Sequence, residues 1–144
     1  NNFILLRSED PYFTTVTRNA THYFKLEVEP TVESVVITKS MDNQKVNLYV
    51  STNKGNTLPS KEKNDFTTAT TRSDYISIPK EEIKKACGKV YQNGSSVFDE
   101  SRRCYFYISA STDSTEYVYF NLYFQLNRTM VQLRNGQSLE LPFP

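Results

Sequence analysis

The chain has 144 residues, a formal net charge of +1, and 38% hydrophobic and 13% aromatic residues. This length suits one domain that buries a core of its own. The near-zero net charge and the lack of a basic tract argue against a nucleic-acid binder or a binder of anionic membranes, and the apolar runs, such as 3–6, are too short to span a bilayer. Few glycines and many aromatic residues are typical of a β-rich globular domain.

Alternation of apolar and polar residues predicts most of the secondary structure. Residues 3–6 are expected to form a short apolar strand, which polar turn residues at 7–11 end. Residues 13–18 favour a short edge strand, and 21–29 alternate strictly, the pattern of an antiparallel strand with one wet face. Further strands are expected at 32–38, 46–52, 74–78, 104–110 and 116–127.

Two segments depart from this pattern. Residues 53–71 have no periodicity and are rich in Lys, Asn, Ser and Thr, so we interpret them as an excursion over the surface that includes a short strand near Phe66. Residues 79–86 predict a short helix, because Pro79 suits the first turn and acidic residues precede basic ones.

The C-terminal segment predicts a hairpin. Asn135-Gly136 stands between alternating residues at 129–134 and 137–141, and this dipeptide favours a two-residue type I′ turn. Strands at this spacing predict an all-β fold, an antiparallel two-sheet sandwich of jelly-roll or immunoglobulin-like type with one short helix. We expect residues 12–144 to form the sandwich, and residues 1–11 to form an N-terminal strand and linker.

The two cysteines predict a disulfide. Cys87 and Cys104 flank a segment with Gly and Asn-Gly turn signals, which we interpret as a long surface loop. Closing it stabilises the fold by about 3 kcal/mol in the chain-entropy model. The alternative is a pair of unpaired buried thiols in a cytosolic protein. We favour the disulfide and an extracellular location, and a first residue other than Met fits a processed secreted chain or a trimmed one.

Three sequons also fit a secreted chain. Asn19, Asn93 and Asn127 each begin an N-x-S/T motif near a predicted turn or strand end, where a glycan would face water. Chance alone gives about as many motifs in a chain with this composition. N-glycans are therefore expected as covalent partners only in a eukaryotic secretory source.

The sequence lacks the catalytic and metal-binding motifs of most enzyme classes. His22 is the single histidine, which leaves no His pair for zinc or copper and makes a Ser-His-Asp triad depend on a half-exposed strand residue. Phosphate-binding glycine motifs and a nucleophile elbow are missing from the sequence. Glu27 and Glu29 share one strand face, but such alternating charges are more typical of solvated surface than of a glycosidase pair. We expect a non-enzymatic protein without cofactor or metal.

Tyrosines are the most informative polar residues. The non-core positions of two successive strands carry Tyr105, Tyr107, Tyr117, Tyr119 and Tyr123. We expect them to form a contiguous aromatic face, which would bind a glycan or another protein subunit. The alternative is ordinary packing of tyrosines between neighbouring strands.

The apolar N-terminal residues allow two interpretations. Phe3, Ile4, Leu5 and Leu6 can form the first strand of the chain's own sandwich. They can also act as a donor strand that completes a neighbour's sheet, since a polar linker follows them. Head-to-tail donation does not close, so it would build a filament from copies of this chain.

Short motifs resemble the bacterial pre-peptidase C-terminal domain family. The similarity lies in Tyr23-Phe24-Lys25-Leu26-Glu27-Val28, in Val46-Asn47-Leu48-Tyr49-Val50-Ser51 with Pro59 following, and in Cys104-Tyr105-Phe106-Tyr107-Ile108. The resemblance implies a β-sandwich of the kind that follows secreted peptidases. The layout of the N-terminal strand is also similar to that of extracellular subunits that assemble by strand exchange.

Together these patterns favour an extracellular structural or adhesive subunit that self-associates into a filament through its N-terminal strand. The alternative is an accessory carbohydrate- or protein-binding module of a secreted enzyme.

Overall fold

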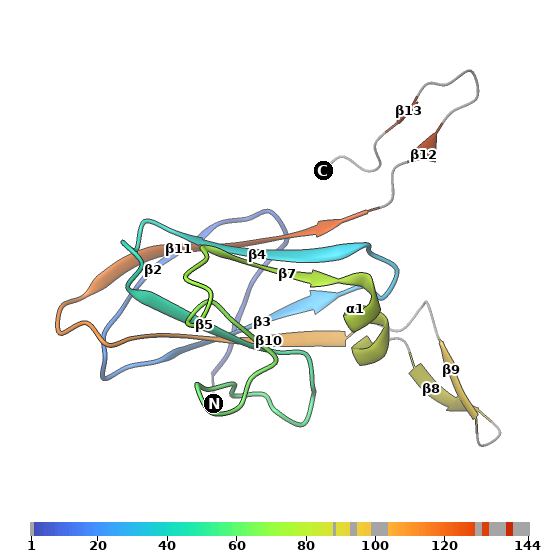
Figure 1. Ribbon diagram of the computed structural model, residues 1–144, viewed down its shortest axis with the longest axis horizontal. Helices are drawn as coiled ribbons and strands as arrows, with labels where there is room; N and C mark the ends of the chain where they lie inside the picture. Colours follow the sequence, from blue (N-terminus) through green and yellow to red (C-terminus); the bar gives the residue numbers. More distant parts are fainter. Residues whose placement is uncertain are drawn as a thin grey trace.

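The chain folds into two β-sheets packed face to face, as the computed structural model shows (Figure 1). Residues 2–87, 89–92, 95–98, 104–128, 131–132 and 138–139 are described, the four shortest segments by their backbone pairing alone. Sheet A contains, in spatial order, β1 (Ile4–Leu5), β3 (His22–Val28), β10 (Cys104–Thr112), β5 (Val46–Ser51) and β6 (Phe66–Thr67). Sheet B contains β2 (Tyr12–Val16), β11 (Val118–Asn127), β4 (Ser34–Ser40) and β7 (Tyr75–Pro79).

All pairings within the two sheets are antiparallel except the pairing of β1 with β3. Helix α1 (Lys80–Cys87) follows β7, and two separate hairpins complete the described elements. They are β8 (Lys89–Gln92) with β9 (Ser95–Phe98), and β12 (Val131–Gln132) with β13 (Ser138–Leu139). The prediction of an all-β antiparallel two-sheet sandwich with a short helix is therefore confirmed.

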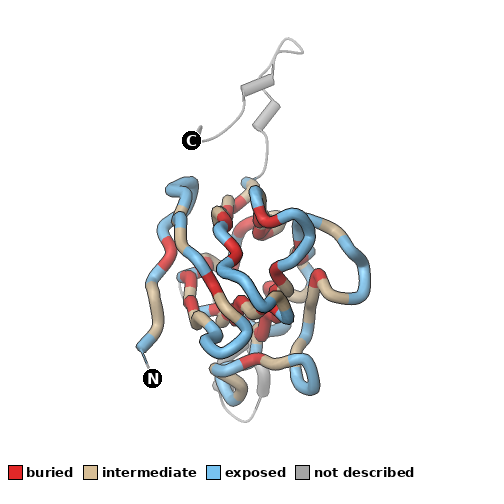
Figure 2. Tube along the Cα trace, turned by 90° about the vertical axis from the view of Figure 1, so that its left-hand side faces the viewer, coloured by how far each residue is buried: buried red, intermediate tan, exposed pale blue. Residues whose placement is uncertain are grey.

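Alternation along the strands builds the core. In β4 and β11, buried positions regularly alternate with partly exposed ones, and Figure 2 shows this alternation along the trace. The buried set comes from both sheets and is mostly aliphatic, because each strand turns one face toward the other sheet. Phe24, Phe106 and Phe120 are the largest of its apolar members.

The predicted strand positions are confirmed within a few residues, but the segment between the two cysteines differs from expectation. The segment between the two cysteines, interpreted as a loop, contains β8 and β9, and Gln92 lies opposite Ser95, which leaves a two-residue connection. In the C-terminal hairpin Gln132 lies opposite Ser138. Asn135 and Gly136 lie outside the described residues, so the two-residue turn there stays a prediction.

The N-terminal segment is anchored in the chain's own sandwich. Ile4 pairs with Phe24 in parallel, and the amide of Leu6 donates to the carbonyl of Lys25 at 2.9 Å. The Leu6 side chain is buried in the core. The amide of Glu9 then donates to Phe124 of sheet B at 2.8 Å, so this segment connects the edges of both sheets. Donation of β1 to a neighbouring chain stays a prediction.

The excursion after β5 covers part of the outer surface of sheet A. Ser109, on the outer side of β10, is buried and donates a hydrogen bond to the carbonyl of Pro59 at 2.7 Å. Asp65 accepts from the amide of Thr52 at 3.0 Å, which closes the base of the loop. Tyr49 is also buried. Desolvation raises the pKa of Tyr49 above its usual 10.0, and the negative charges of Asp113 and Glu62 raise it further. This side of the sandwich is therefore largely occupied by its own chain.

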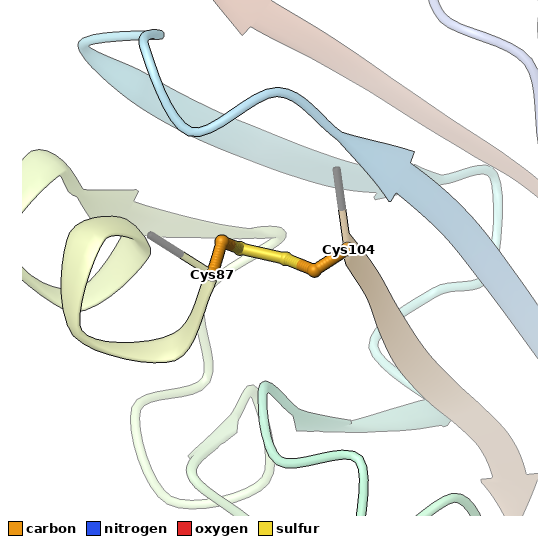
Figure 3. The surroundings of a disulfide bond; sticks show 2 residues. All are labelled: Cys87 and Cys104. Carbon is orange, nitrogen blue, oxygen red and sulfur yellow. A yellow bond between two sulfur atoms is a disulfide. The ribbon is translucent and has the colours of Figure 1, made fainter. Parts of the chain in front are cut away.

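The disulfide is confirmed. Cys87 at the end of α1 is bonded to Cys104 at the start of β10, with their Cα atoms 5.4 Å apart (Figure 3). Ile83 of α1 is also buried in the core. Covalent and apolar contacts thus fix the helix against one end of the sandwich.

A buried ion pair lies near the β4–β5 turn. Lys39 occupies an inward position of β4 and is almost fully buried. Its Nζ lies 2.7 Å from Asp42 Oδ2 and 3.4 Å from Asp74 Oδ1, and Asp42 Oδ2 also accepts from the amide of Val46 at 3.1 Å. The ammonium group is thereby satisfied inside the fold, as a buried charge requires.

Candidate functional site

The predicted tyrosines do not share one surface. Tyr105 and Tyr107 lie on β10 in sheet A, whereas Tyr119 and Tyr123 lie on β11 in sheet B, and Tyr117 is in the connection between these strands. The prediction of a contiguous aromatic face is therefore wrong. The physical reason is that the chain crosses from one sheet to the other between these two strands, so their outer faces point in opposite directions.

The sheet A tyrosines have partners within the chain. The ring of Tyr107 packs against Phe3 with centroids 5.5 Å apart, and Lys25 Nζ lies 5.0 Å from the ring centroid of Tyr105. Both tyrosines line a pocket of about 610 Å³ beside the disulfide, whose wall also carries charged residues such as Glu82 and Lys85. Both tyrosines therefore pack against other side chains of this chain, next to charged residues.

The outer side of sheet B differs sharply from this surface because it carries no charged side chain. We call it the neutral face and define it by the outward positions of its strands. These are Phe13 and Thr15 of β2, Tyr119, Asn121, Tyr123, Gln125 and Asn127 of β11, Ser34, Val36, Thr38 and Ser40 of β4, and Tyr75, Ser77 and Pro79 of β7.

The strand register arranges these residues in rows across the sheet. One row is Tyr123–Thr38–Tyr75, and the next along the strands is Gln125–Val36–Ser77. On the other side of the tyrosine row lie Phe13, Asn121 and Ser40. Aromatic rings thus alternate with hydroxyl and amide groups over the sheet.

Three aromatic residues of the neutral face are exposed, and the fourth, Tyr123, is partly exposed. Phe13 and Tyr119 stack with centroids 6.2 Å apart and an angle of 20° between their rings, and they retain 52% and 47% exposure. Tyr75 is 56% exposed on the edge strand β7. Sequence reasoning missed Phe13 and Tyr75. Both residues lie in predicted strands, and in each strand the odd-numbered residues face away from the core.

Hydrogen bonds hold the polar groups of this face in place. Asn127 Nδ2 donates to Ser34 Oγ at 2.9 Å, and Gln125 Nε2 donates to Asn127 Oδ1 at 2.9 Å. Asn121 Nδ2 lies 3.4 Å from Ser40 Oγ. These amides are therefore positioned before any ligand arrives, which lowers the entropic cost of binding.

The sequons fall in different surroundings. Asn19 is exposed in the turn between β2 and β3, where a glycan would have room. Asn127 lies at one end of the neutral face and takes part in the amide contacts described above. Asn93 lies outside the described residues, so its glycosylation stays a prediction, as it does at the other two sites.

The single histidine contacts a backbone carbonyl of a neighbouring segment. His22 Nε2 lies 2.6 Å from the carbonyl oxygen of Thr15, so this nitrogen carries the proton and links β3 to β2. Within 2–87 and 104–128, no three His, Cys, Asp or Glu side chains gather closely enough to hold a metal ion. No helix in the described part of the chain has the length and apolar character to cross a membrane.

Comparison with known proteins supports the fold. Neither a protein-family model nor a curated protein sequence matches the chain. Among solved structures, it is similar to Aeromonas hydrophila PliG, a periplasmic inhibitor of g-type lysozyme. The TM-score is 0.54 with 9% sequence identity, and the match covers 87% of this chain and 96% of that one. At this identity the likeness shows a shared fold.

Proposed function

We propose that the chain is an extracellular, non-enzymatic binding module whose ligand surface is the neutral face. The observation that carries this proposal is a whole outer sheet surface without a charged side chain, on which exposed aromatic rings lie beside ordered amides and hydroxyls. Exposed patches that hold large aromatic groups commonly mark interaction sites. In contrast, the chain's own loop and Phe3 cover much of the outer side of sheet A.

Two further observations support the location and the class. The Cys87–Cys104 disulfide suits an oxidising compartment outside the cytosol. One solved structure with a similar fold is a periplasmic inhibitor of g-type lysozyme, which supports a binding role rather than a catalytic one. The same neighbour favours a protein as a second candidate partner, because its stated target is a lysozyme.

Charge insertion tests the proposed surface. Thr38→Glu places a carboxylate in the middle of the neutral face, and Ser77→Glu does so at an exposed edge position. The control is Glu27→Lys, which changes an exposed charge on the outer side of sheet A. Binding of each variant would be measured on an array of glycans and on a panel of extracellular proteins that includes g-type lysozyme.

We expect both neutral-face variants to lose binding by at least about tenfold, because a bound ligand would desolvate an unpaired carboxylate. Glu27→Lys should bind like the wild type. Equal loss in all three variants, or no loss in Thr38→Glu with its melting temperature unchanged, would contradict the proposal.

Filament assembly through the N-terminal strand is a separate prediction. Removal of residues 1–8 should abolish filaments seen by electron microscopy if β1 is donated between chains. A preparation that stays monomeric in light scattering before and after the deletion would exclude it.

A further inference from the structure

We infer that the neutral face binds an uncharged, extended glycan chain that crosses the strands of sheet B and stacks sugar rings on Tyr123 and Tyr75. This inference rests on the proposed function and names the ligand class for the same surface.

The absence of charge is the first argument. Acidic glycans and charged protein surfaces are recognised through Lys, Arg, Asp and Glu side chains, which gain most from charge-assisted contacts. The neutral face carries none of them, while the outer side of sheet A has Lys25 and Glu27 on its β3 positions. An uncharged ligand with many hydroxyl groups matches the Asn, Gln, Ser and Thr side chains that are present.

The size of the face is the second argument. With strands about 4.8 Å apart and a rise of about 3.4 Å per residue, three neighbouring strands span about 10 Å, and β11 from Tyr119 to Asn127 spans about 27 Å. No row contains all four strands, because β2 pairs with β11 only at 118–122 and β7 pairs with β4 only at 34–38. The resulting area of about 270 Å² is roughly a third of what each partner buries in a stable protein–protein interface. It suits a narrow chain better than a second globular protein or a second copy of this one.

The spacing of the tyrosines is the third argument. Tyr123 and Tyr75 stand in one row on strands two positions apart, with Thr38 between them, so their backbones are about 10 Å apart. This is close to the length of two sugar units in an extended β-linked chain, in which every second ring presents the same face. The apolar C–H face of a sugar can then cover each phenol ring. The hydroxyl groups of the sugar remain in contact with water or with polar side chains nearby.

Polar groups on both sides of the tyrosine row complete the site. Gln125 and Ser77 lie in the adjacent row on one side, and Asn121 and Ser40 lie on the other. The contact of Asn121 Nδ2 with Ser40 Oγ at 3.4 Å orients that amide within the face. A glycan that follows the row would therefore meet hydroxyl and amide groups along both edges.

The test is isothermal titration calorimetry of the whole chain with defined hexasaccharides. The probes are β-1,4-linked glucose and N-acetylglucosamine hexamers, an α-1,4-linked glucose hexamer, and an acidic galacturonate hexamer. The variants are Tyr75→Ala, Tyr123→Ala and Tyr75→Phe, and Tyr105→Ala is the control because Tyr105 is 40% exposed but lies on β10 of sheet A.

We expect binding of at least one neutral β-linked hexamer, a loss of about 2- to 10-fold in affinity in Tyr75→Ala and in Tyr123→Ala, and near-normal binding in Tyr75→Phe and Tyr105→Ala. Preference for the acidic or the α-linked hexamer would overturn this inference. Absence of binding to every hexamer, together with a protein partner whose binding Thr38→Glu abolishes, would overturn the glycan ligand and leave the proposed function standing. Glycan binding that resists both Tyr75→Ala and Thr38→Glu would overturn both.

Discussion

The buried ion pair of Lys39 and Asp42 predicts a large loss of stability when only the carboxylate is removed. Asp42→Ala removes the carboxylate 2.7 Å from Lys39 Nζ and also the acceptor of the Val46 amide. Because the ammonium group stays in the core without its closest counter-charge, we expect the free energy of unfolding to fall by about 3–5 kcal/mol. For a chain of this size the melting temperature should fall by about 6–20 °C. Urea unfolding at pH 7, with calorimetry on the same samples, measures both quantities.

Two variants control this experiment. Asp74→Ala removes a second carboxylate, 3.4 Å from the same nitrogen, but its side chain is 54% exposed, so a loss below about 1 kcal/mol is expected. Lys39→Met combined with Asp42→Ala replaces the pair with an apolar side chain and should recover most of the loss seen in Asp42→Ala. If Asp42→Ala costs no more than Asp74→Ala, or if the double variant is no better than Asp42→Ala, the reasoning about the buried charge is refuted.

Three further predictions concern stability. Leu6→Ala should cost about 2–3 kcal/mol in urea unfolding because Leu6 fills the chain's own core, and an unchanged midpoint would mean that it does not. The raised pKa of Tyr49 means that the unfolded state ionises first, so stability should fall as the pH rises from 10.0 through the pKa in the folded state. Tyr49→Phe should reduce that alkaline loss, which unfolding curves from pH 8 to 11 would test against the wild type. Replacing Cys87 and Cys104 together with Ser should cost about 3 kcal/mol, and equal stability of the reduced and oxidised wild type would argue against it.

Strand positions could be predicted because alternation is a local property. The apolar side of β11 is readable from residue 118 to 126, and every one of those inward residues is buried. In β4 the same alternation did not identify Lys39 as a buried residue. Lys39 is the next inward position after Ile37, but a lysine is normally expected on the surface. Its burial depends on Asp42 and Asp74, and spacing alone does not show that these carboxylates converge on it.

The arrangement of strands into sheets could not be predicted in the same way. β10 and β11 are consecutive and both carry outward tyrosines, but the chain crosses between sheets after Thr112. Neighbours of β11 are β2 and β4, which are far away in sequence, and these pairings bring Phe13 beside Tyr119. The neutral face is therefore a product of long-range pairing, although the lack of charge at its outward positions is visible once the strands are placed.

Asn-Gly dipeptides show the limit of local turn rules. Asn93-Gly94 lies between β8 and β9, whose register leaves a two-residue connection, whereas the Gly and Asn-Gly turn signals of this segment had favoured a long surface loop. At Asn135-Gly136 the same rule predicts a hairpin, and β12 pairs with β13 on either side of that dipeptide. Turn preference indicates a hairpin, but the pairing of the flanking strands decides the number of loop residues.

Nuclear magnetic resonance mapping tests whether the neutral face is the ligand surface. The isotope-labelled chain would be titrated with a soluble β-1,4-linked hexasaccharide, and backbone amide shifts would be followed residue by residue. We expect changes concentrated on β11, β4 and β7 around Tyr123, Thr38 and Tyr75. Changes concentrated instead around Tyr105 and Tyr107, beside the disulfide, would contradict it.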